Sequence, residues 1–571
     1  MPKGYYEVRI FLTFFFIYSF FIYWSTWNEE SFFALVRAIV EENRFEIDSF
    51  QNQTGDRVYH AGHVYSQDTP GLPFLSSFIY KLWKDVYFNF FPKWFKEVHK
   101  GSSDYLVEKP FLALRIISPG FFILTSMILL TTLTSSLFSA LSVVLVYKIS
   151  EFFIKNNATR LFLTIVYGLG TSIFPYSLTF QSEAVSTFLT FLAFYILFIN
   201  KQREERKIFH TNFSSGIFLG YSVVTNPFVI LTVPLLSAYC FYSFKKKENK
   251  LSFIFGILLG ILPLLIYNHF VFSNVFNTFS YYSSTIFRLF LFKLSSIGYG
   301  ELIPFNRYFA GLDYNIHVIF MRLLFYPARG LFFHYPILLF SLLGLYFMKK
   351  KFKAEAILII SIFLVFVIAN SLYFSWSGGL CFGPRYLAPL APFLSLPLAF
   401  IFKKNLIKYL LFFACLSIFT NFLGLQTLAP FLPNLPTPPI ISQLNSFEIL
   451  KNPLKEHYIP LFFKNGPRSR IFEEIISGKV EVDIRHWSPQ FGTADQYLKF
   501  YKIDLLSSNY LKIALRVPFL SMIPVTLVTF LLWGKEIFQN KHVRKILMKD
   551  EFVFILTILF LLLFLSFIEI Q

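Results

Sequence analysis

Long apolar segments recur along the whole chain, and they limit its fold more than any other feature of the sequence. A transmembrane helix needs about 20 consecutive, mostly apolar residues. Runs close to that length lie at 9–25, 121–147, 159–177, 182–200, 251–270, 331–348, 354–374, 386–402, 406–426, 515–534 and 552–569. Only 15% of the residues are charged, whereas soluble proteins carry about 25%. The sequence therefore predicts an all-α polytopic membrane protein.

One further apolar segment, 213–243, is too long for a single span and is interrupted at Asn226-Pro227. Proline interrupts the hydrogen-bond ladder of a helix and disfavours helical structure at the residue before it. We therefore interpret 213–243 as two short spans that meet near Asn226-Pro227. This brings the expected total to about 13 transmembrane helices.

Basic residues gather in the short links between the spans. Lysine and arginine concentrate in the cytoplasmic loops of membrane proteins. If the N-terminus is cytoplasmic and 213–243 crosses the membrane twice, six basic clusters fall on the cytoplasmic side. These clusters lie at 148–160, 201–207, 245–250, 349–353, 403–408 and 535–549. The net charge of +19 is thus explained by topology, and nucleic-acid binding is not predicted.

The same topology places four segments on the outer face of the membrane. They are 26–110, 271–330, 375–385 and 427–514. We expect a transmembrane module at 1–426 that carries the first three of these loops, an outer-face segment at 427–514 and a transmembrane pair at 515–571. Because the cytoplasmic links are short, function is expected on the outer face.

Two stretches of the first outer loop have amphipathic or aromatic-rich patterns. Residues 31–42 place apolar side chains on one helical face and charged side chains on the other. Residues 81–98 are rich in aromatic and basic side chains. Both are predicted to be helices that lie at the membrane interface.

Carboxylates are scarce, 33 in 571 residues, yet several gather in the first outer loop. A general base must lie within hydrogen-bond reach of the proton that it removes, with a pKa set by its surroundings. For Asp56 and Asp68 taken alone, the capping of a turn is the simpler interpretation. Glu29 and Glu30 could simply mark the membrane interface. The candidates for a catalytic base are Asp56, Glu30, Asp68, Glu29 and Asp48.

Metal binding is not required by any pattern in the sequence. His60 and His63 would suit half of a metal site, but solvated loop histidines are the commoner arrangement. The loop carboxylates could instead hold a divalent cation, and this alternative stays open. The three cysteines are far apart and show no zinc or redox spacing. No metal ligand is therefore assigned.

Two arginines stand where outer loops meet apolar spans. Arg385 follows a glycine-rich link that also contains Trp376, and Arg329 stands in a second link. A guanidinium fork suits a phosphate. An arginine in an aromatic belt at the membrane interface is the simpler alternative for both. Glu183, at the outer end of the fourth span, faces either a cavity or the lipid headgroups.

These pieces together resemble the polytopic GT-C glycosyltransferases. The resemblance is to bacterial members related to protein O-mannosyltransferases and to the lipid A aminoarabinose transferase. It rests on an acidic first outer loop, the run at 35–48, Gly62-His63-Val64-Tyr65-Ser66 with Pro70-Gly71, Arg329-Gly330-Leu331-Phe332 and Gly383-Pro384-Arg385-Tyr386-Leu387. It covers residues 1 to about 426. Two places depart from the family pattern: Asn28-Glu29-Glu30 replaces an Asp-Glu pair, and Gln67-Asp68 replaces Asp-Lys.

The resemblance implies transfer of a sugar from a polyprenyl-phosphate donor to a lipid, glycan or protein acceptor, on the outer face of a bacterial inner membrane. A first-loop carboxylate would be the base, with Asp56 the first choice. Arg385, Arg329 and Tyr386 would bind the donor phosphate. The substrate cavity would be lined by Trp376, His63, Tyr65 and Glu183. The competing hypotheses are a transporter or flippase of a lipid-linked substrate and a non-catalytic scaffold.

Overall fold

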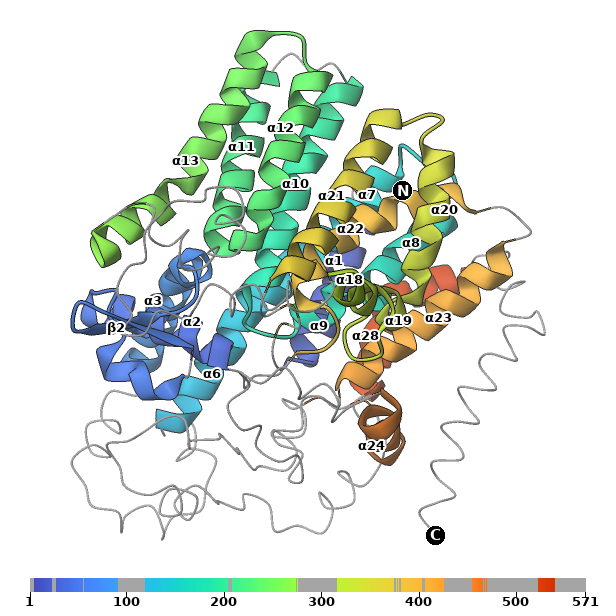
Figure 1. Cartoon of the computed structure of the whole chain (residues 1–571). Helices are drawn as coiled ribbons and strands as arrows, with labels where there is room; N and C mark the ends of the chain where they lie inside the picture. Colours follow the sequence, from blue (N-terminus) through green and yellow to red (C-terminus); the bar gives the residue numbers. More distant parts are fainter. Residues whose placement is uncertain are drawn as a thin grey trace, which may run out of the picture.

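The computed structural model describes residues 5–22, 27–54, 56–90, 119–203, 208–273, 316–373, 381–402, 406–425, 454–465 and 522–539, together with positions 275, 376, 378, 467 and 469. These residues form a bundle of apolar helices, and the first outer loop builds a smaller unit at one end of it (Figure 1). The fold is helical, as predicted, with one β-hairpin in the described residues.

Five helices in the described part of the chain are long and apolar enough to cross a membrane. They are the continuous helix Phe122–Ser150, α10 (Ser182–Arg203), α13 (Lys247–Phe272), α21 (Lys353–Leu372) and α23 (Ile407–Gly424). The first of these contains most of α6 (Pro119–Thr131), the π-helical turn η4 (Thr132–Ser136) and α7 (Leu137–Ser150). The membrane class is supported, but the expected total of spans is not confirmed.

Shorter helices complete the bundle. They are α1 (Tyr5–Phe20), α8 (Asn157–Gly170), α9 (Ile173–Ser177), α11 (Ile208–Thr225), α12 (Thr232–Ser243), α18 (Ile316–Phe325) and α28 (Met522–Gln539). The segment expected outside at 427–514 contributes η11 (Leu454–Tyr458) and α24 (Ile459–Asn465). The span predicted at 552–569 lies outside the described residues.

The break predicted at Asn226-Pro227 is confirmed. Helix α11 ends at Thr225, a 3₁₀ turn η5 (Pro227–Leu231) follows, and α12 begins at Thr232. The Asn226 side chain accepts a hydrogen bond from the backbone N–H of Phe228, at 3.0 Å. This cap satisfies a donor that the interrupted helix would otherwise leave open.

Three other predicted spans are not continuous α-helices, which corrects the sequence interpretation. Residues 159–177 divide into α8 and α9, with Thr171 extended between them. Residues 331–348 divide into α19 (Leu331–His334), η6 (Pro336–Leu338) and α20 (Leu339–Met348). Residues 385–400 divide into η7 (Arg385–Leu390), α22 (Ala391–Ser395) and η8 (Leu396–Phe400). Prolines at 336, 389, 392 and 397 each remove a backbone N–H and restrict the helix there.

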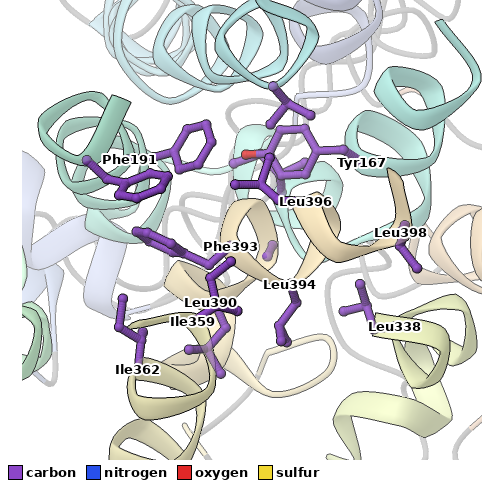
Figure 2. Packing of buried hydrophobic residues seen from close by; sticks show 14 of the residues in the cluster. Tyr167, Phe191, Leu338, Ile359, Ile362, Leu390, Phe393, Leu394, Leu396 and Leu398 are labelled. Carbon is purple, nitrogen blue, oxygen red and sulfur yellow. The ribbon is translucent and has the colours of Figure 1, made fainter. Parts of the chain in front are cut away.

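The segment from η7 to η8 lies in the middle of the hydrophobic core. Figure 2 shows Phe393 and Leu394 among side chains from other elements, including Phe191 of α10 and Ile359 of α21. The rings of Phe393 and Phe191 are 5.5 Å apart and perpendicular. Irregular backbone is tolerated at membrane depth only where protein or water covers it. Its burial therefore explains how this segment can be interrupted.

Helices α11 and α13 approach each other closely because four glycines face each other. A Cβ atom added at Gly216 would lie 2.1 Å from the Phe253 carbonyl oxygen, and one at Gly256 would lie 2.1 Å from the Phe213 carbonyl oxygen. Gly220 and Gly260 repeat this contact one turn further along. Small residues four apart are the usual means by which membrane helices bring their backbones together.

Residues in or beside four of the basic clusters meet at one end of the bundle. The ring of Phe153 contacts those of Phe198, Phe352 and Phe400, with centroids 4.8–5.8 Å apart. The predicted topology requires this grouping. Which end faces the cytoplasm stays a prediction.

The first outer loop forms a compact unit at the opposite end (Figure 1). It contains α2 (Trp27–Arg37), the π-turn η1 (Ala38–Glu42), the 3₁₀ turn η2 (Asp48–Gln53), strands β1 (Arg57–His60) and β2 (His63–Ser66), and α3 (Gly71–Phe90). The helix predicted at 31–42 is present, but the residues of α2 from Asn28 to Val36 are all buried. That helix is thus covered by protein and does not lie on a lipid surface.

Helix α3 keeps the character of an interfacial helix. It begins at Gly71, ten residues before the predicted start at 81. Phe78, Leu82 and Val86 are between 46% and 69% exposed and share one helical face. Its place at the membrane interface stays a prediction, and the predicted residues 91–98 lie outside the described residues.

Candidate active site

A β-hairpin brings Asp56 and Asp68 close together, although they are twelve residues apart in the sequence. Strands β1 and β2 pair antiparallel, with Arg57 opposite Ser66. Ala61 and Gly62 form the turn with positive φ angles of 50° and 86°. Two-residue turns of this kind match the twist of a hairpin. The register places Asp56 and Asp68 at the open end, where the Gln67 N–H donates to the Asp56 carbonyl at 3.2 Å.

A continuous chain of hydrogen bonds joins Arg385 to this end of the hairpin. The Arg385 Nε donates to Glu183 Oε1 at 2.5 Å, and its Nη2 donates to Asn28 Oδ1 at 2.6 Å. The Asn28 Nδ2 then donates to Asp68 Oδ1 at 2.5 Å. These four residues come from η7, α10, α2 and the link between β2 and α3. The network therefore joins the outer loop to the helical bundle.

One edge of the Arg385 guanidinium has no hydrogen-bond partner among the described residues. Its Nε and Nη2 are occupied as above, and within the described residues Nη1 makes no hydrogen bond. The Arg385 side chain is 14% exposed, whereas that of Glu183 is 1% exposed. A guanidinium has five N–H donors in a fixed plane. Arg385 is thus anchored on one edge and can still donate to an anion from the other.

Glycines in the link before η7 allow the chain to reach this position. Gly378 and Gly383 have φ angles of +74° and +68°. A Cβ added at Gly378 would lie 3.0 Å from the Cβ of Arg385. Both glycines thus adopt a left-handed conformation that other residues rarely take.

Tyr386 is fixed by other aromatic rings. Its ring stacks on that of Phe228, with centroids 4.5 Å apart, and meets the edge of Tyr373 at 5.4 Å. The Arg385 guanidinium carbon lies 5.9 Å from the Tyr386 ring centroid. Tyr386 therefore supports the start of η7 directly beside Arg385.

The two hairpin carboxyls have different surroundings. Burial raises the pKa of Asp56, and the nearby positive charge of Arg385 partly offsets this effect. Burial raises the pKa of Asp68 well above its usual range, and the negative charges of Asp56 and Glu183 add to it. Asp68 accepts a hydrogen bond from Asn28, whereas the Asp56 carboxylate makes none in the described part of the chain. Burial thus favours the protonated form of Asp68, and the Asp56 carboxylate is the one without a hydrogen-bond partner in the described residues.

The backbone around Asp56 is held firmly. The Ser31 Oγ lies 2.7 Å from both the Asp56 carbonyl oxygen and the Ser66 Oγ. The Asp56 N–H donates to Thr54 Oγ1 at 3.0 Å. Further along, Thr69 Oγ1 donates to the Thr225 carbonyl at 2.8 Å, at the break after α11. These bonds give the unbonded carboxylate a fixed position above the bundle.

Asp48 and His63 form a separate pair. The His63 Nδ1 lies 2.7 Å from Asp48 Oδ2, and the Val64 N–H donates to Asp48 Oδ1 at 2.7 Å. The hydrogen bond to Asp48 raises the pKa of His63. His63 lies at the turn of the hairpin, about 10 Å along the strand from Ser66. The structure therefore does not bring Asp48 and His63 to the Arg385 network.

Tyr65 also has a partner of its own. Its hydroxyl donates to Glu46 Oε1 at 3.3 Å, and burial together with Glu46 raises its pKa to about 12. Tyr65 is 4% exposed. It supports the hairpin from within the loop unit and does not contact Arg385 through any of these bonds.

The remaining predicted residues lie near the network but play different parts in the packing. Glu29 and Glu30 are buried on α2 beside Asn28. Arg329 Nη1 donates to the Cys381 carbonyl at 2.8 Å, so it braces the link that precedes Arg385. Trp376 is 4% exposed and packs in the main hydrophobic core. No group of three or more His, Cys, Asp or Glu side chains in the described residues is arranged to hold a metal ion.

Sequence reasoning missed Asn28 and the hairpin. Asn28 was noted only as a departure from the family pattern, and nothing in the sequence pairs it with Arg385. The hairpin did leave a signal, since Ala61-Gly62 separates two short runs that contain Val and Tyr.

No protein-family model and no curated protein matches the chain. The fold and the site thus define a polytopic helical membrane protein with a buried Arg–carboxyl network at one end.

Proposed function

We propose that this protein is a membrane glycosyltransferase of the GT-C type, in a bacterial inner membrane with the N-terminus cytoplasmic. It would move a sugar from a polyprenyl-phosphate donor to a lipid, glycan or protein acceptor on the outer face. One observation carries the proposal: the Asp56 carboxylate, which makes no hydrogen bond within the described residues, lies in the electrostatic range of Arg385, whose Nη1 makes none there either. A base and a phosphate-binding cation are the two groups that such a transfer needs.

In the proposed reaction, Asp56 takes the proton of the acceptor hydroxyl as its oxygen bonds to the anomeric carbon. The bond from that carbon to the phosphate oxygen breaks on the opposite side, so the configuration inverts. The leaving polyprenyl phosphate keeps the electron pair, and Arg385 Nη1 donates to it. Fixed donors aimed at a developing negative charge are usually the largest contribution to catalysis.

The surroundings of the other carboxyls make Asp56 the best candidate for the base. Asp68 is hydrogen-bonded to Asn28, and burial raises its pKa well above its usual range. Asp48 is engaged by His63 at the far end of the hairpin. Glu29 is fully buried and Glu30 is 9% exposed. A base must combine an ionised carboxylate with access to the substrate.

The test is sugar transfer by the purified protein supplied with polyprenyl-phosphate sugars and membrane acceptors. Asp56→Asn should lower kcat by roughly 100-fold or more, because the base is lost. Arg385→Lys keeps the charge but loses the fork, and it should lower kcat less than Arg385→Ala. Asp48→Asn is the matched control and should leave kcat near that of the wild type. Equal transfer by wild type, Asp56→Asn and Arg385→Ala would refute the site.

Transport of a lipid-linked substrate is the second candidate, and the broken segments favour it. Transporters form their sites where discontinuous helices meet. Here 213–243, 331–348 and 385–400 are all interrupted. Protein reconstituted in vesicles with a labelled polyprenyl-phosphate sugar in one leaflet would decide. Movement of the label to the other leaflet without transfer would favour a flippase, and transfer without movement would favour the enzyme.

A further inference from the structure

Asn28 lies between Arg385 and Asp68 and is hydrogen-bonded to both. We propose that Asn28 is a positioning residue, whose side-chain amide sets the separation between Arg385 and the carboxyl pair of Asp56 and Asp68. This inference rests on the proposed function for its catalytic consequence. Its structural part, a bridge that requires an amide, stands on the hydrogen bonds alone.

The bridge uses both ends of the amide. Asn28 Oδ1 accepts from Arg385 Nη2 at 2.6 Å, while Asn28 Nδ2 donates to Asp68 Oδ1 at 2.5 Å. Asn28 is 7% exposed, so water does not readily replace either bond. A neutral amide can accept from a guanidinium and donate to a carboxyl at the same time. An ionised carboxylate of the same shape has no donor, so it can make only the first bond.

Charge also favours an amide at this position. The titratable groups of the described residues that act on Asp68 include Asp56 before β1, Glu183 on α10, Arg385 on η7 and Tyr267 on α13. Only Arg385 in this set is positive. A further carboxylate at position 28 would add negative charge beside Asp56 and Glu183 and compete with Glu183 for Arg385. When protonated, however, such a carboxyl could again donate to Asp68.

These properties make Asn28→Asp a pH-dependent test. The exchanged pair Asn28→Asp with Asp68→Asn is the matched control, because it keeps the number of carboxyls. In that double variant the new amide at position 68 donates to the new carboxylate at position 28, which still accepts from Arg385. The hydrogen-bonded chain is thus rebuilt with its donor and acceptor exchanged.

Two measurements on the full-length protein in lipid nanodiscs separate the bridge from the chemistry. The first is the thermal unfolding midpoint from about pH 5.5 to 8.5. Asn28→Asp should unfold well below wild type at the alkaline end and close to it at the acidic end, and the double variant should recover the midpoint. The second is sugar transfer, where Asn28→Asp should lose roughly 100-fold in kcat/KM at the alkaline end. The double variant should recover most of that loss.

Each outcome decides a different point. The bridge is refuted if the unfolding midpoint of Asn28→Asp equals that of wild type at every pH. It is also refuted if the midpoint of the double variant is not higher than that of Asn28→Asp. If the double variant recovers unfolding but not transfer in an active protein, positioning is refuted as the role of Asn28. If wild type transfers no sugar while the double variant recovers unfolding, the bridge stands and the proposed function fails.

Discussion

The ion pair between Arg385 and Glu183 gives the clearest prediction of stability. Glu183→Gln keeps the size of the side chain and removes its charge. Glu183 is 1% exposed and Arg385 is 14% exposed, so the pair is largely shielded from water. Removing one partner of a buried pair costs about 3–5 kcal/mol. Because Asp56 and Asp68 still act on Arg385, we expect the lower end, about 3 kcal/mol, or roughly 150-fold in the unfolding equilibrium.

The pair between Glu151 and Arg160 provides a matched control. Glu151 is 46% exposed, and exposed pairs contribute about 0–1 kcal/mol. Unfolding of Glu183→Gln, Glu151→Gln and wild type should be followed in detergent micelles over a range of denaturant at neutral pH. Glu183→Gln should be the less stable variant by about 2 kcal/mol or more. If the two variants are equally stable, the Arg385 network does not hold the outer loop to the bundle as we infer.

Two further predictions concern other parts of the molecule. Gly256→Ala should destabilise the protein by about 1–3 kcal/mol, because its Cβ would lie 2.1 Å from the Phe213 carbonyl oxygen. Gly170→Ala is the control: the nearest contact of its Cβ is at 3.4 Å, so it should destabilise the protein much less in the same unfolding assay. Asp48 raises the pKa of His63, so the stabilisation by their pair should be complete below about pH 6.5 and fade as the pH rises through the raised value. The stability difference between wild type and His63→Gln, measured against pH, should therefore shrink on the alkaline side.

The helical class was predictable because apolar runs of sufficient length have few other solutions. The break at Asn226-Pro227 was predictable for a similar reason, since a proline in a segment of that length needs a turn. The interruptions at 331–348 and 385–400 were harder to foresee. These segments are apolar throughout, and a stretch buried in the core has the same composition as one that faces lipid. Only their prolines indicated a difference.

The residue types of the site were predictable, but their pairing was not. A chain with few charges draws attention to each carboxylate and arginine, and Asp56, Asp68, Glu183 and Arg385 were identified in this way. Glu183 and Arg385 are 202 residues apart, and no local pattern reports a contact over such a distance. Asn28 was noted only as a departure from the family pattern, because nothing local in the sequence links an asparagine to a distant arginine. Here its side chain joins two charged groups.

The balance of charge at the site bears on what it can receive. Within the network Arg385 is the single positive group, and Glu183, Asp56 and Asp68 face it. If all three carboxyls were ionised, the site would repel a phosphate in spite of its arginine. Burial raises the pKa of Asp68 and so disfavours its negative charge beside Arg385. The same burial that makes Asp68 unsuitable as a base thus makes Arg385 more effective as a phosphate ligand, and the two carboxyls of the hairpin serve the proposed reaction in different ways.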